Sequence, residues 1–109
     1  MSSEEFIQVF KGRGPKSAFN AAVKQALHDH GHSGYTGSIA EKMEEGFVMF
    51  PLPKTGDENL EQRAIDEANR LMGHGQSGTR DGRIDSKYQP AGCIEIQKGT
   101  YVFFGFAQS

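Results

Sequence analysis

The stretch that decides the fold is CIEIQKGTYVFFGFA, residues 93–107. It holds two apolar runs, Cys93 to Gln97 and Tyr101 to Ala107, and the pair Lys98-Gly99 between them predicts a tight hairpin turn. Aromatic rings fall on both faces of the second run, which predicts a strand at the centre of a sheet or in a subunit interface. Cys93 lies inside an apolar run and is interpreted as a small buried hydrophobe rather than a nucleophile.

The segments before the hairpin predict two amphipathic helices and three further strands. The first helix begins at Pro15 and stops around His30, and the second carries an apolar stripe from Leu60 to Met72 after a possible Thr55–Glu58 capping box. The predicted strands run from Phe6 to Phe10, from Tyr35 to Lys42 and from Gly46 to Pro53.

This order, β-α-β-β-α-β-β, predicts an α+β fold with a mostly antiparallel sheet and both helices on one face. We expect a single domain covering residues 1–109. The element order is similar to the ferredoxin-like plan with an extra C-terminal strand, a similarity of order that carries no function.

Composition restricts the classes of partner. The chain has 36% hydrophobic and 24% charged residues and a net charge of -2, with no dense basic run, so nucleic acid is not the expected partner. A single cysteine excludes an intramolecular disulfide and an all-cysteine zinc site. The acidic N-terminus and the short apolar runs predict a cytoplasmic location, with no membrane partner and no cofactor.

Two basic segments are candidates for binding an anion. The first is the glycine-bearing turn from Lys11 to Ser17, where cations surround the expected amino end of a helix. The second is the long loop of residues 77–92, in which arginines alternate with aspartates. The alternative interpretation makes the turn a solvated connection and the loop a surface segment whose charges pair with one another.

The leading hypothesis is a binding module that holds an anionic small molecule, such as a nucleotide or another phosphate-bearing metabolite, between these two segments. Its candidate ligand-binding residues are Arg13, Gly14, Lys16, Ser17, Tyr35, Arg80, Arg83, Lys87 and Tyr88.

Two other functions stay open. One is a ligand-free homo-oligomer, expected to be a homodimer through the sheet, because two helices on one face would leave the other sheet face to be covered by a second copy. A metal-dependent enzyme would use His28, His30, His32 or His74 with Asp29 or Glu41, although these histidines equally suit an exposed helix end. The neighbours Glu41 and Lys42 would transfer protons only if buried, and are otherwise an exposed polar strand face.

Overall fold

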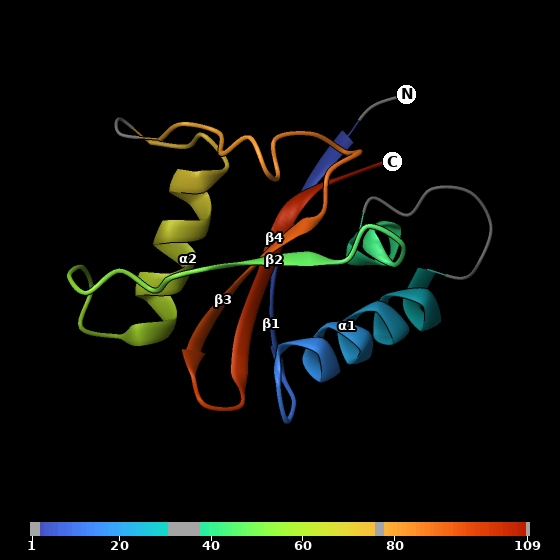
Figure 1. The fold of residues 1–109 in the computed structure, drawn as a ribbon, viewed down its shortest axis with the longest axis horizontal. Coiled ribbons are helices and arrows are strands. Elements are labelled where there is room, and N and C mark those ends of the chain that lie inside the picture. The colour runs from blue at the N-terminus through green and yellow to red at the C-terminus, as the bar shows by residue number, and fades with distance from the viewer. Residues whose placement is uncertain (1–2, 31–37, 76–77, 109) are drawn as a thin grey trace.

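The computed structural model describes residues 3–30, 38–75 and 78–108, and its ribbon is drawn in Figure 1. The elements in chain order are β1 (Ser3–Lys11), α1 (Pro15–His30), the 3-10 helix η1 (Ile39–Lys42), β2 (Phe47–Phe50), α2 (Leu60–Leu71), β3 (Ala91–Gln97) and β4 (Thr100–Gln108). The predicted α+β class is confirmed, and the chain forms one domain with a radius of gyration of 13.2 Å.

The four strands form one mixed sheet in the order β1-β4-β3-β2. β4 pairs antiparallel with both β1 and β3, whereas β2 runs parallel to β3. The central position predicted for the aromatic final strand is therefore confirmed. β1 and β2 are the two edge strands.

The two helices lie on opposite faces of this sheet, with α1 on the right and α2 on the left in Figure 1. The expectation of both helices on one face is wrong. The similarity to the ferredoxin-like plan is therefore limited to the order of the elements and does not extend to their arrangement around the sheet. An amphipathic stripe shows that one side of a helix is buried, but it does not show which sheet face buries it. Both faces are covered, so the reason for expecting sheet-to-sheet dimerisation disappears.

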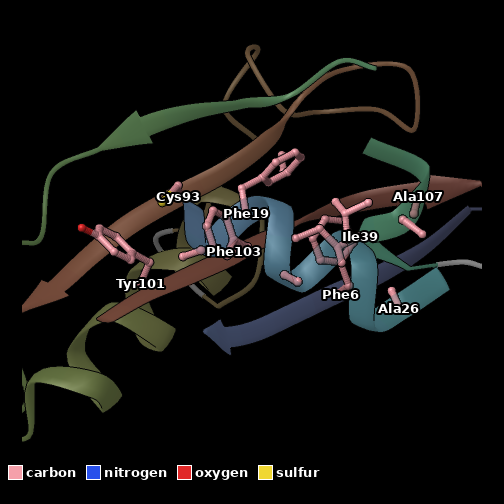
Figure 2. Packing of buried hydrophobic residues seen from close by; sticks show 13 residues of the cluster. Phe6, Phe19, Ala26, Ile39, Cys93, Tyr101, Phe103 and Ala107 are labelled. Atoms are coloured by element: carbon pink, nitrogen blue, oxygen red, sulfur yellow. The ribbon is translucent and has the colours of Figure 1, made fainter. Parts of the chain in front are cut away.

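Residues of β4 alternate between two hydrophobic clusters because successive side chains of a strand point to opposite faces. The Phe103 ring packs with Phe19 of α1 and with Phe47, at centroid distances of 5.6 and 5.8 Å. Figure 2 shows this first cluster between α1 and the sheet. Phe104 belongs to the second cluster, which α2 covers.

Gly92 of β3 lies opposite Phe104 of β4, and its lack of a side chain makes room for that ring. A Cβ atom at position 92 would lie 2.3 Å from the phenyl ring, far inside van der Waals contact. The glycine therefore has a packing role that its sequence position does not reveal.

Two local predictions are wrong. Residues 39–42 form η1 instead of part of a strand, because the Ser38 hydroxyl caps this turn by accepting from the Ala40 amide at 3.2 Å. Helix α2 is capped by Asn59, whose side chain accepts from the Gln62 amide at 3.0 Å, and not by a Thr55–Glu58 box. Residues 35–37 of the predicted strand lie outside the described residues.

Candidate functional site

The turn between β1 and α1 is held closely against the β3–β4 hairpin. The Gly12 amide donates to the Gly99 carbonyl at 3.0 Å, and the Ala18 amide closes the first turn of α1 by donating to the Gly14 carbonyl at 3.0 Å. A Cβ atom on Gly12 would lie 2.6 Å from the Ala18 amide nitrogen, so only glycine fits there. Pro15 is the first residue of α1, as predicted.

Exposed cations gather around this turn. We define the basic end as Lys11, Arg13, Gly14, Lys16, Ser17 and Lys98. Its four cationic side chains make no hydrogen bond or ion pair with any described residue, and the first turn of α1 carries no carboxylate. The amides of the first helical turn add partial positive charge at the same place.

The arginines of the long loop have protein partners instead. The Arg80 guanidinium lies 4.4 Å from the centroid of the Phe106 ring, and its Nη1 donates to the Asp85 carbonyl at 3.4 Å. The Arg83 guanidinium donates to both carboxylate oxygens of Asp81 at 3.0 Å and lies 4.2 Å from the centroid of the Phe50 ring. The two arginines therefore cover aromatic rings of the α2 face of the sheet.

The ion pair between Arg83 and Asp81 also changes their protonation equilibria. The hydrogen bond from Arg83 lowers the pKa of the Asp81 carboxyl, and the same bond raises the pKa of Arg83. Both shifts favour the charged forms, so the pair persists at neutral pH.

Lys42 fastens the end of this loop to η1. Its side chain is 0% exposed, and its Nζ donates to the carbonyls of Lys87 at 3.0 Å and Gln89 at 2.6 Å. Burial lowers the pKa of Lys42, while Glu45 and Glu41 act in the opposite direction. The ammonium is committed to two backbone acceptors, an arrangement that serves to anchor the loop rather than to transfer a proton.

Lys87 and Tyr88 extend from the anchored part of the loop. The Lys87 Nζ lies 5.4 Å from the centroid of the Tyr88 ring, and Tyr88 is 68% exposed. Beside Tyr88 there is a groove of about 520 Å³ whose lining includes Met43, Glu44 and Glu45. This acidic surface was not predicted, because the pair Glu44-Glu45 is a common pattern on exposed segments.

The two predicted basic segments do not meet. Lys11 pairs with Thr100 at the hairpin end of the sheet, whereas Arg80 lies over Phe106, which pairs with Glu5 at the other end. Six residues of strand separate these positions, about 20 Å at ~3.3 Å per residue. Figure 1 shows the first turn at the bottom and the long loop at the top. The shared pocket expected between them is therefore absent, and Tyr35 lies outside the described residues.

The histidines are also divided between distant places. His28, on α1, lies 3.7 Å from the Asp29 carboxylate, while His74 follows α2 and its Nε2 contacts the Glu5 carboxylate at 2.7 Å. Within residues 3–30, 38–75 and 78–108, no three His, Cys, Asp or Glu side chains are arranged to hold a metal ion. The side chain of His30 and all of His32 lie outside the described residues.

A cavity of about 410 Å³ lies beside α2 and is lined by both basic and acidic side chains. Arg70 in this cavity is bound to both oxygens of Glu67 at 2.7 Å, and Arg63 donates to the Asp57 carbonyl at 2.9 Å. These cations are neutralised or occupied locally, so the cavity favours an anion less than the basic end does.

Cys93 is buried, in agreement with its interpretation as a core residue. Burial, with a smaller contribution from Glu95, raises the pKa of its thiol to about 12. A thiol with such a pKa is protonated at neutral pH and is a poor nucleophile.

Comparisons with protein-family models, curated proteins and solved structures found no match for this chain. Among the described helices, none has both the length and the apolar character needed to cross a membrane.

Proposed function

We propose that the protein is a binding module for a small anionic ligand carrying phosphate groups, and that the ligand binds at the basic end. The proposal rests on one observation, the gathering of four exposed cations without described partners around the amino end of α1. The long loop is no longer part of the proposed site, because its arginines contact Asp81 and aromatic rings.

The geometry of the basic end suits a phosphate group. The amides of Lys16 and Ser17, which follow Arg13 in the first turn of α1, donate no backbone hydrogen bond to a described residue, because they precede the first bonded turn of the helix. A phosphate here would receive backbone hydrogen bonds together with side-chain charge, the usual arrangement at helix amino ends.

The proposed setting is the cytoplasm, where a lone thiol such as Cys93 stays reduced.

Isothermal titration with pyrophosphate, nucleotides and sugar phosphates tests the proposal. The double variant Arg13→Ala, Lys16→Ala is expected to weaken binding at least tenfold, which corresponds to about 1.4 kcal/mol. The matched control is Lys24→Ala, Lys54→Ala, which removes two exposed cations from other parts of the surface and should leave the affinity unchanged. Binding should also weaken as salt is added.

Two results would contradict this function. One is the absence of binding to the whole panel by the wild-type protein at low ionic strength. The other is equal affinity in the Arg13→Ala, Lys16→Ala variant and the control, because binding would then occur elsewhere on the surface.

A further inference from the structure

The outer edge of β1 is long and, apart from charged residues near its two ends, lacks the features that usually prevent pairing with another chain. All nine residues of β1 keep a constant register with β4, so the strand has no bulge, and it contains no proline. The other edge strand, β2, has four residues and is followed by Pro51 and Pro53. Since natural proteins commonly protect sheet edges with short strands, bulges or prolines, β1 is the unprotected edge.

The hydrogen bond that follows the last β1–β4 pair shows which residues of β1 bond to β4 and which direct their backbone groups outward. The Gly12 amide donates to the Gly99 carbonyl at 3.0 Å, in the same register as the β1–β4 pairs. In an antiparallel ladder every second residue bonds toward a given neighbour, so the even-numbered residues of β1 bond to β4. Glu5, Ile7, Val9 and Lys11 therefore direct their amides and carbonyls outward, away from β4.

The side chains of β1 form a chemical palindrome centred on Gln8. Residues 5–11 read EFIQVFK, which is acid, aromatic, aliphatic, glutamine, aliphatic, aromatic and base. Phe6 and Phe10 lie on the α1 face, and Ile7 and Val9 lie on the α2 face. Reversing the strand about Gln8 keeps each kind of side chain on its own face, and the two end charges exchange sign.

We propose that two copies of this chain associate through β1, with the strands antiparallel and a two-fold axis at Gln8, to form a continuous eight-stranded sheet. Facing residues in this register lie equally far from Gln8 on its two sides, which keeps even positions opposite even positions. Ile7 faces the second copy's Val9, Phe6 faces its Phe10, and Glu5 faces its Lys11. The outward residues supply about eight backbone hydrogen bonds across the boundary.

Charge complementarity is the reason for choosing a second copy as the partner. Glu5 Oε1 contacts His74, and its Oε2 makes no bond to the described residues, which leaves it available for a lysine of the second copy. Lys11 is exposed, and its side chain makes no hydrogen bond or ion pair with the described residues. Centring the pairing on Ile7 instead would place Phe6 against Gln8 and Glu5 against Val9, so this neighbouring register loses the match.

Sedimentation velocity from about 1 to 100 µM tests whether the dimer exists. The wild type is expected to dimerise. Val9→Pro removes one outward amide at an edge position where proline is tolerated, and it should yield a folded monomer by circular dichroism. A wild type that stays monomeric over this whole range overturns the proposal.

Exchanging the end charges separates a specific pairing from general loss of stability. Lys11→Glu places two acids opposite each other and should raise the dimer dissociation constant at least about tenfold. Combining it with Glu5→Lys should restore the wild-type dissociation constant to within about threefold, because each acid again faces a base. A double variant that is no better than Lys11→Glu alone overturns the predicted register.

Oxidative cross-linking locates the axis. In the proposed dimer the two copies of residue 8 face each other as a non-hydrogen-bonded pair, whose Cβ atoms lie ~5 Å apart, close to disulfide range. Gln8→Cys should therefore form a covalent dimer, whereas Ile7→Cys and Glu4→Cys should not, and buried Cys93 does not compete. Preferential cross-linking of Ile7→Cys would overturn the Gln8 axis.

This association goes beyond the proposed ligand binding and can be tested separately from it. The anion titration changes Arg13 and Lys16, whereas Val9→Pro and Gln8→Cys test the dimer without changing a residue of the basic end; Lys11 belongs to both surfaces. A dimer that binds no phosphate compound would contradict only the proposed function, and a monomer that binds one would contradict only this inference.

Discussion

Replacing Lys42 with methionine measures how strongly the long loop is anchored. The ammonium donates to the Lys87 and Gln89 carbonyls at 3.0 and 2.6 Å, and the side chain is fully buried. Methionine has a similar shape and fills the space, but it leaves both acceptors without their donor. A hydrogen bond to a charged group contributes about 1.5 to 3 kcal/mol, so the two bonds together are worth ~3 to 6 kcal/mol.

The desolvation of the ammonium opposes these bonds, as the lowered pKa of Lys42 indicates. We therefore expect Lys42→Met to reduce the free energy of unfolding by about 2 to 4 kcal/mol, less than the full value of two bonds. Urea denaturation followed by far-UV circular dichroism measures this change, and hydrogen exchange should show faster exchange of the amides of Ile84 and Gln89.

The matched control is Lys54→Met, which changes an exposed lysine without a described partner and should alter stability by no more than about 0.5 kcal/mol. If Lys42→Met is as stable as this control and its loop amides exchange at the wild-type rate, the anchoring role is refuted. Desolvation would then cancel the two hydrogen bonds completely.

Three further predictions concern packing. Gly92→Ala should destabilise the fold by about 1 to 3 kcal/mol in urea denaturation, because its Cβ meets the Phe104 ring, and a value near zero would show that the ring moves freely. Native Cys93, with a pKa of about 12, should react with iodoacetamide at pH 8 only as fast as the protein unfolds, and rapid labelling would contradict its burial. Arg83→Ala should expose Phe50 and speed tryptic cleavage within residues 78–90, whereas unchanged cleavage would show that the stacked guanidinium does not restrain the loop.

The sequence predicted the elements better than their assembly. Helix α1 was located from Pro15 to about His30, because an apolar stripe and a proline in the first turn are local signals. The strand from Phe6 to Phe10 was also predicted, and its alternation places Phe6 and Phe10 on one side of the sheet and Ile7 on the other. The side of the sheet that each helix covers was not predicted. It depends on the parallel pairing of β2 with β3, and these two strands are far apart in the sequence.

The candidate site was predicted less well, for a related reason. A run that alternates arginine and aspartate fits both a ligand-covering loop and a self-paired one, and only the positions of Phe50 and Phe106 decide between them. Lys42 was missed as an anchor because lysine is almost never fully buried unless it is paired, and its acceptors lie 45 and 47 residues away in the sequence.

The alternating side chains of β4 contribute to both hydrophobic clusters of the molecule, one on each face of the sheet. The adjacent residues Phe103 and Phe104 belong to different clusters, one beneath each helix, and are joined by a single peptide bond. Any displacement of this strand disturbs both sides at once, so neither helix keeps its packing when the other is released. Such coupling makes the domain behave as one cooperative unit, in which partly unfolded forms that retain only one helical layer are poorly populated.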